Sequence, residues 1–191
     1  MGLKVKLIKS EEYCNTYVVT DGKTTIIIDA GATPEKLKKI LNKRKPSAIL
    51  QTHAHYDHVY YADTYRSDYN CPIYAPDSED EITVGTIDIK PILAPGHSSD
   101  SVLYLIENHL FTGDVLFDEG IGRTDLTSGD EKSMQKSLKK LLNVKFKMAY
   151  HGHDAPSKYK SQIENIKANI KQEPESQTSS HPDENHDEAD V

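Results

Sequence analysis

The stretch Thr52-His53-Ala54-His55-Tyr56-Asp57-His58 places three imidazoles and a carboxylate within six residues. It follows a short apolar run, Ala48-Ile49-Leu50, which predicts a β-strand. Alternate residues of an extended chain point the same way, so His53 and His55 aim at one point. The next two side chains, Asp57 and His58, come where a helix would begin and are directed toward a second point nearby. The stretch therefore predicts two adjacent, half-built metal sites, each of which needs ligands from elsewhere in the chain.

Two simpler explanations compete with a metal site at this stretch. The histidines could gather in a polar loop by chance, or Asp57 could serve only as the N-cap of a helix. The whole chain has nine histidines among 191 residues, so three within six positions are a poor match to chance. We therefore expect metal binding.

Charge and composition indicate the domain organisation and argue against some classes of partner. The formal net charge of −7 comes from residues 172–191, which hold seven acidic residues and no Lys or Arg; the other 23 acidic residues balance the 23 basic ones. We predict one domain over residues 1–171 and a disordered acidic tail over residues 172–191, because the tail has too little apolar surface to offset the entropy of ordering. The body has no basic stripe, which argues against a nucleic-acid partner.

The cell compartment is predicted from what the sequence lacks. No apolar run approaches the length of a membrane span, and the first residues have no apolar export segment. The two cysteines, Cys14 and Cys71, are far apart and outside every motif, which fits reduced thiols better than a disulfide framework. We expect a cytoplasmic protein without a membrane partner.

Hydrophobic periodicity predicts many short strands with a few helices between them. The strands are expected at residues 3–8, 13–20, 24–29, 48–50, 72–75, 82–91, 102–106, 110–112 and 146–150. Asp21-Gly22 predicts a hairpin between the second and third strands, and continuous Ile26-Ile27-Ile28 predicts a strand covered on both faces. This alternation predicts sheets enclosed by helices, not a simple doubly wound fold.

Helices are predicted where apolar residues recur at helical spacing. We expect them at residues 35–45 after Pro34, 58–69, 131–143 after an Asp130 cap, and 157–170. His109 follows Glu107-Asn108 between two strands and is predicted to be an exposed turn residue.

Three later strand ends supply the further metal ligands that the first stretch lacks. His97 lies on the Pro95-Gly96 turn, Asp114 follows Gly113, and His151 and His153 flank Gly152. Each residue has a simple structural alternative as a turn, cap or packing residue. Side chains at strand ends can nevertheless converge on one rim that the sheet holds rigid, so together they predict a complete two-metal set.

This ordered series resembles the metallo-β-lactamase superfamily. The matching features are Asp29, the H-x-H-x-D-H motif at 53–58, P-G-H at 95–97, G-D at 113–114 and G-H at 152–153. The resemblance covers residues 3–170 and implies an α/β fold, the four-layer αβ/βα metallo-β-lactamase sandwich, with the metals at one edge of two sheets.

The resemblance also implies which side chains bind metal. Two divalent metals are expected, zinc foremost, with iron and manganese as alternatives. His53, His55 and His97 would hold the first metal, Asp57, His58 and His153 the second, and Asp114 would bridge both. His151 remains the alternative to His153, because the residue before Gly152 is itself a histidine. Asp57 and Asp114 are the predicted catalytic residues, and Asp29 is expected to support the ligand loop from behind.

A second motif points to one branch of the superfamily. Gly122-Arg123-Thr124-Asp125 resembles the G-R-T-D stretch of the glyoxalase II-like branch, in which Arg123 and Asp125 are expected to fix a loop behind the ligands. An ordinary surface Arg-Asp pair is the alternative.

The branch implies a metal-dependent hydrolase that acts on a small-molecule thioester, as hydroxyacylglutathione hydrolases do. Members of the branch that are specific for glutathione thioesters have a larger helical region after the last ligand, whereas this chain has one predicted helix there. A small acyl thioester without glutathione is therefore expected equally with a glutathione thioester. The alternatives are a mononuclear iron persulfide dioxygenase using His53, His97 and Asp114, a lactonase, and a non-enzymatic metal-binding protein.

Overall fold

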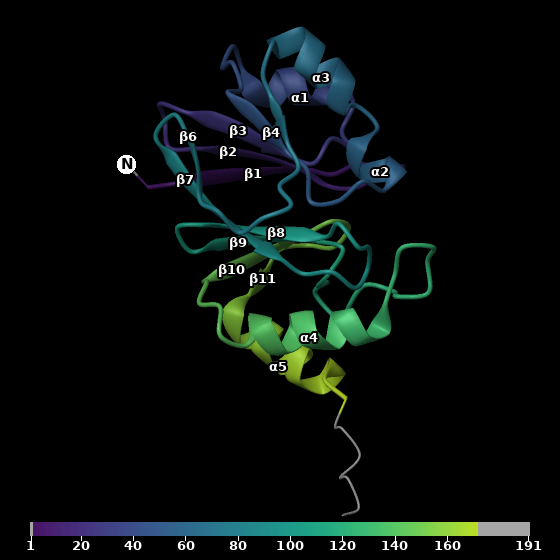
Figure 1. Cartoon of the computed structure of the whole chain (residues 1–191). Helices are drawn as coiled ribbons and strands as arrows, with labels where there is room; N and C mark the ends of the chain where they lie inside the picture. Colours follow the sequence, from purple (N-terminus) through teal and green to yellow (C-terminus); the bar gives the residue numbers. More distant parts are fainter. Residues whose placement is uncertain (1, 172–191) are drawn as a thin grey trace, which may run out of the picture.

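The computed structural model describes residues 2–171 and shows two β-sheets stacked face to face between helices (Figure 1). The predicted acidic tail, with its boundary at residue 172, lies outside the described residues. The first sheet has the order β1-β2-β3-β4-β5, and the second has the order β11-β10-β9-β8-β7-β6. The strands are β1 (Lys4–Ile8), β2 (Thr16–Thr20), β3 (Thr25–Ile28), β4 (Ala48–Leu50), β5 (Ile73–Tyr74), β6 (Ile82–Val84), β7 (Ile87–Leu93), β8 (Val102–Ile106), β9 (His109–Gly113), β10 (Met148–His151) and β11 (Ser157–Lys158).

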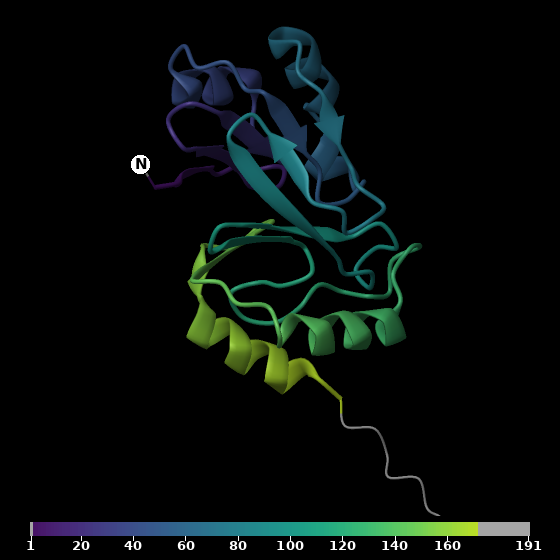
Figure 2. The same cartoon turned by 60° about the vertical axis from the view of Figure 1, so that its left-hand side comes forward.

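The helices form the two outer layers. They are α1 (Pro34–Leu41), α2 (Tyr56–Val59), α3 (Ala62–Tyr69), α4 (Glu131–Leu141) and α5 (Tyr159–Asn169). Figure 1 shows α1 and α3 over the first sheet, and Figure 2 shows α4 and α5, in green and yellow, side by side beneath the second. The four-layer αβ/βα sandwich predicted from the sequence is confirmed.

Alternation along the strands builds three apolar layers. In β3, Ile26 and Ile28 join the core between the two sheets, whereas Ile27 packs with Leu37 and Leu41 of α1. The prediction that this run is covered on both faces is therefore confirmed. In the second sheet, β8 shows the same alternation. Its inner residues are Val102, Tyr104 and Ile106; its outer residues, Leu103 and Leu105, pack with α4 and α5.

The predicted hairpin and the Asp130 cap are also confirmed. β2 pairs with β3 in antiparallel register, and Asp21 Oδ1 accepts hydrogen bonds from the backbone N–H groups of Lys23 and Thr24, each at 2.8 Å. Gly22 adopts φ +97°, a left-handed conformation that glycine allows at little cost. Asp130 accepts from the Ser133 N–H at 2.7 Å and so caps α4.

Two local predictions were wrong. The single helix expected at 58–69 is divided into α2 and α3. Backbone groups between them form hydrogen bonds with Ala30 instead of within a helix: Ala30 donates to the His58 carbonyl, and Tyr61 donates to the Ala30 carbonyl. His109 is not an exposed turn residue. It begins β9, is half-buried, and its Nδ1 lies 2.8 Å from the Tyr150 hydroxyl.

Strand pairing brings the predicted site residues to one edge of the sandwich. β3 and β4 are parallel, as are β9 and β10. The carboxyl ends of each parallel pair therefore lie together, which gathers Asp29 with the ligand loop and Asp114 with Gly152. The turn that carries His97 is fixed by α4, because the Asp130 N–H donates to the Gly96 carbonyl at 2.8 Å.

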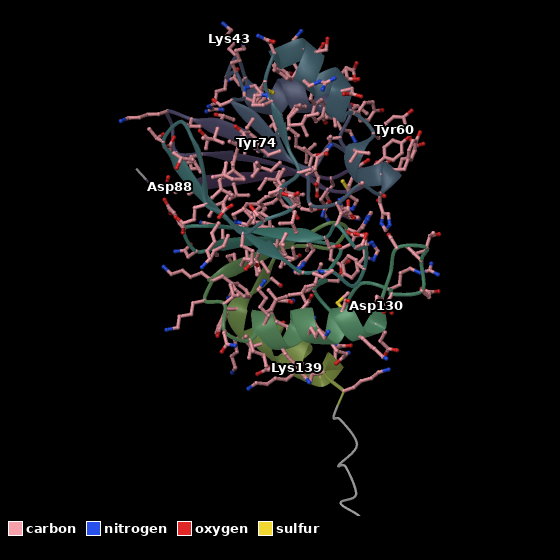
Figure 3. The ribbon with its side chains drawn as sticks, viewed as in Figure 1. Lys43, Tyr60, Tyr74, Asp88, Asp130 and Lys139 are labelled. Carbon is pink, nitrogen blue, oxygen red and sulfur yellow. The ribbon has the colours of Figure 1, made fainter. Side chains whose placement is uncertain are left out.

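We predict that Asp130→Ala lowers the free energy of unfolding by about 1 kcal/mol, because the first turn of α4 loses its side-chain acceptor. Asp130 lies at the start of this helix (Figure 3). Chemical denaturation measures the change, and Lys132→Ala in the same exposed turn is the control, expected to shift stability by less than about 0.5 kcal/mol. Equal losses in the two variants would contradict the capping role.

Candidate metal centre

Three histidine nitrogens converge at the end of β4. His53 Nε2 lies 3.0 Å from His55 Nδ1, and His97 Nε2 lies 2.9 Å from the same His55 atom. Nitrogen ligands of a tetrahedral zinc stand roughly 3.3 Å apart, given Zn–N distances of about 2.0–2.1 Å. The spacing in this first cluster therefore fits three ligands around one small cation, with the nitrogens slightly closer to each other than in a filled site.

A second cluster lies beside the first. His153 Nε2 is 3.1 Å from Asp57 Oδ2, and His58 Nε2 is 3.6 Å from the same oxygen. Asp114 stands between the clusters: its Oδ1 lies 3.1 Å from His58 Nε2, and its Oδ2 lies 3.3 Å from His153 Nε2 and 3.7 Å from His97 Nε2. All seven side chains predicted as ligands are thus brought together, and Asp114 occupies the position expected of a bridge.

The buried Asp29 carboxylate fixes the orientation of two ligand rings. Asp29 Oδ2 accepts from the Thr52 hydroxyl and from His58 Nδ1–H, both at 2.9 Å. Since the Thr52 hydroxyl gives its hydrogen to Asp29, it accepts from His53 Nδ1–H at 3.1 Å. In their neutral form both rings therefore carry the proton on Nδ1, so each Nε2 lone pair faces the clusters.

His97 is oriented in the same way by a backbone carbonyl. Its Nδ1–H donates to the Arg123 carbonyl at 3.0 Å, so the Nε2 lone pair points into the first cluster. Burial lowers the pKa of His97, and burial followed by repulsion from His58 lowers the pKa of His53 to about 2. Both imidazoles are held neutral at physiological pH, the form that binds a metal.

The second cluster favours positive charge. Burial alone would lower the pKa of His58, but Asp29 and Asp114 outweigh it and raise that pKa well above the ordinary value. Hydrogen bonds to Asp114 and Asp57 raise the pKa of His153 to about 9. Burial works against ionisation of Asp114, but His153 and His58 lower its pKa far below the usual range. A divalent cation bound here would displace these histidine protons.

Two orphaned atoms show that the residues fit a metal. His58 Nε2 and Asp114 Oδ1 are both buried and lie 3.1 Å from each other, but neither makes a hydrogen bond of acceptable geometry among residues 2–171. Leaving a buried polar group unpaired costs about 1–3 kcal/mol. Both atoms face the same space between the clusters, and a cation coordinated by both would remove this cost. The donor set of imidazoles and carboxylates suits zinc or iron.

His151 and His153 occupy different environments. His151 is completely buried, with Nδ1 2.7 Å from the Leu116 carbonyl and Nε2 2.8 Å from Ser157 Oγ. Both ring nitrogens of His151 therefore contact other groups of the protein. Among residues 2–171, His151 belongs to none of the groups that could hold a metal ion. The geometry favours His153 as the last ligand.

Comparison with known proteins gives the family. The model of the metallo-beta-lactamase superfamily matches residues 10–88 and 76–153. The chain belongs to this superfamily. A hydroxyacylglutathione hydrolase of Thiobacillus denitrificans is 36% identical over 138 residues, which are 64% of this chain and 53% of that protein. It supports the glyoxalase II-like branch.

One further relative is named as a zinc-dependent enzyme, and one similar solved structure contains iron. A probable polyketide biosynthesis zinc-dependent hydrolase of Bacillus velezensis is 31% identical over 150 residues, covering 68% of this chain and 66% of the relative. The di-iron-bound form of TTHA1623 superposes with a TM-score of 0.74 at 26% identity, covering 84% of this chain and 96% of that one. The family therefore supports a metal-dependent hydrolase.

In this member of the superfamily, the side chains of Arg123 and Asp125 contact each other. Arg123 Nε and Nη2 donate to the two Asp125 oxygens at 2.8 and 2.7 Å. The two side chains are 62% and 69% exposed. The link to the centre runs through the Arg123 backbone carbonyl, which accepts from His97.

Sequence reasoning missed two residues of the loop between β1 and β2. Cys14 lies outside every sequence motif, but its sulfur lies within 4.8 Å of ligand atoms of Asp29 and His58. Asn15 Nδ2 donates to the carbonyls of His151 and Asp154, at 3.0 and 2.9 Å, and so holds the loop that carries His153. A lone Cys-Asn pair has no sequence signal for either contact.

An aromatic stack borders the centre. Tyr13 stacks on Tyr60 with ring centroids 4.3 Å apart, and Tyr56 packs edge-on against Tyr60 at 4.9 Å. Tyr60 lies at the molecular surface beside α2 (Figure 3). A four-residue helix is too short to be stable alone, so these contacts help to hold the helix that presents Asp57 and His58.

We predict that Gly152→Ala abolishes metal binding in the second cluster. A Cβ at this position would lie 1.9 Å from Asp114 Oδ1 and 2.8 Å from His58 Cε1, so Asp114 must move. Zinc titration should show at least a hundredfold weaker binding of one ion. Gly120→Ala is the control: at φ +104° it strains the backbone, but its Cβ meets no atom within 4 Å, so zinc binding should be retained.

Alanine at the two neighbouring histidines should separate metal binding from stability. His153→Ala removes a 43% exposed side chain and should lose one zinc, while its metal-free form loses less stability than metal-free His151→Ala. His151→Ala should keep both zinc ions and lose about 1–3 kcal/mol of stability, because it empties a fully buried position and removes the contact to Ser157 Oγ. Elemental analysis and thermal unfolding measure the two effects; loss of zinc from His151→Ala would contradict the assignment.

Proposed function

We propose that this chain hydrolyses a small thioester at a centre of two divalent metals, zinc in the first instance. His53, His55 and His97 would hold one ion, Asp57, His58 and His153 the other, and Asp114 would bridge them. The observation that carries the proposal is the position of Asp114, whose two oxygens lie 3.1–3.7 Å from histidines of both clusters. A single-metal site would need no such bridge.

When bound, two such metals would lower the pKa of a shared water and polarise a carbonyl oxygen. In hydrolysis, the water oxygen bonds to the acyl carbon, the carbon–sulfur bond breaks, and the sulfur leaves with the electron pair and takes up a proton. A thiolate is a stable leaving group, so the site needs no separate general acid. Asp57, which is half-buried beside His153, is placed to orient the water and accept its proton.

The environment of Cys14 supports a mechanism without a protein nucleophile. Burial raises the pKa of the Cys14 thiol to about 12, so the thiol stays protonated at neutral pH and is a poor nucleophile. Its place behind His58 also separates it from the side of the clusters that faces solvent. The reaction therefore depends on an activated water.

A dioxygenase with one iron at His53, His97 and Asp114 is the second candidate. The two-histidine, one-carboxylate set that such enzymes use is present, with His97 Nε2 3.7 Å from Asp114 Oδ2. The complete second cluster favours the hydrolase, because an enzyme with a single iron has no use for Asp57 and His153 held 3.1 Å apart.

Thiol release from acyl thioesters by the zinc-loaded chain tests the proposal. We expect hydrolysis of S-lactoylglutathione or of a simple acetyl thioester, detected with a thiol reagent, and at least a hundredfold loss in Asp57→Asn. Asp63→Asn, at an exposed carboxylate on α3, is the matched control and should be fully active. One iron per chain with oxygen uptake on glutathione persulfide, and no thiol release, would overturn the proposal.

A further inference from the structure

A cavity of about 330 Å³ lies beside the ligand loop. His53 and Ala54 form one wall of it, so the cavity begins where the first cluster ends. The other walls come from the segment after β5 and from the ends of β7 and β8 with their connecting loop. They include Ala75, Pro76, Leu93, Pro95 and Val102.

Most of the lining surface is apolar, although Gln51, Ser99 and Ser101 add neutral polar groups, and the charged side chains are all negative. Asp77 and Asp100 are the only charged side chains among the residues that line the cavity, and neither Lys nor Arg contributes. Asp100 is held against the ligand loop, since its Oδ2 accepts from the Ala54 N–H at 2.8 Å. An anionic group entering this space would leave water for an apolar wall and meet two carboxylates that no Lys or Arg of the lining balances.

The size of the cavity limits its occupant. At roughly 30 Å³ for each water-sized group, the volume corresponds to about eleven such groups. A linear acyl chain of six to eight carbons would fit. The common thiol carriers of thioesters are larger and bear carboxylates or phosphates, so the size and the charge both suit the acyl side of the substrate.

We propose that this cavity binds the acyl group of the substrate, and that it selects neutral, apolar acyl groups over those that carry a carboxylate. The proposal rests on the thioester hydrolysis proposed above. With the acyl chain in the cavity, the carbonyl carbon lies beside His53 and the thiol side extends toward the opposite, solvent-facing side of the clusters.

Acyl thioesters of N-acetylcysteamine test the selectivity, because their leaving thiol is small, uncharged and the same throughout. From acetyl to hexanoyl, kcat/KM should rise about threefold to fourfold for each methylene that enters the cavity. The succinyl thioester should be at least tenfold slower than the butyryl thioester, and Asp77→Asn should narrow that gap. A flat dependence on chain length, or faster turnover of succinyl, would overturn the proposal.

Filling the cavity gives a second test. Ala75 is exposed at its rim, so Ala75→Trp should fold normally and lower kcat/KM for hexanoyl at least tenfold while acetyl changes less than twofold. Asn143→Trp, at an exposed position in a separate cavity beside α4, is the matched control and should leave both substrates unchanged. Unchanged hexanoyl turnover in Ala75→Trp would overturn the proposal.

A binding measurement separates failure of the cavity from failure of the chemistry. Saturation-transfer NMR with hexanamide on the full chain should show methyl signal in the wild type and in Asn143→Trp, and loss of it in Ala75→Trp. If no thioester is hydrolysed but hexanamide binds in this pattern, thioester hydrolysis fails and the apolar cavity stands. If acetyl thioester is hydrolysed and hexanamide does not bind, the hydrolase stands and the acyl site is wrong.

Discussion

The Asp29 carboxylate is the contact on which the centre depends. It lies at the end of β3 with φ +57°, a left-handed conformation that aspartate tolerates better than most residues. It accepts from the backbone and the hydroxyl of Thr52 and from His58, each at 2.9 Å. One buried acceptor thus connects the ends of two strands to the helix that follows them. It also decides which nitrogen of His53 and His58 carries the proton, and so which lone pairs face the metals.

The two-sheet architecture turns this local network into a site for two metals. The first sheet delivers Asp29 and the ligand loop, and the second delivers His97, Asp114 and His153. Neither sheet holds a full set of ligands, so the centre exists only when the sheets pack. His58 Nε2 and Asp114 Oδ1 reflect that arrangement: they are buried 3.1 Å apart without a well-formed hydrogen bond, and a cation that binds both would stabilise the fold. The centre is therefore coupled to stability as well as to chemistry.

Much of this could be read from the sequence because the decisive signals are local. Two histidines at alternate positions of the extended segment after β4, a Pro-Gly turn before His97 and a glycine before Asp114 each carry their geometry within a few residues. The choice between His151 and His153 is different. In a regular strand both would point the same way, but β10 ends at His151 and its register with β9 shifts between Tyr150 and His151. Such an irregularity re-aims side chains, and no residue pattern announces it.

Long-range contacts account for the other differences. Cys14 and Asn15 reach the centre only because the loop between β1 and β2 folds over the end of β10, a contact between residues more than 130 positions apart. The break between α2 and α3 has the same kind of cause, since Ala30 takes the hydrogen bonds that a continuous helix would need. His109 belongs to β9 because it pairs with Ile106 of β8 and Met148 of β10, and its ring contacts the Tyr150 hydroxyl.

The most direct test of the two-metal centre is anomalous X-ray diffraction from crystals of the zinc-loaded chain, measured on both sides of the zinc edge. A two-metal centre should give two peaks, one within about 2.2 Å of nitrogens of His53, His55 and His97, and the other within about 2.2 Å of Asp57, His58 and His153. Asp114 should place an oxygen on each. A single peak, or a peak coordinated by His151, would contradict it.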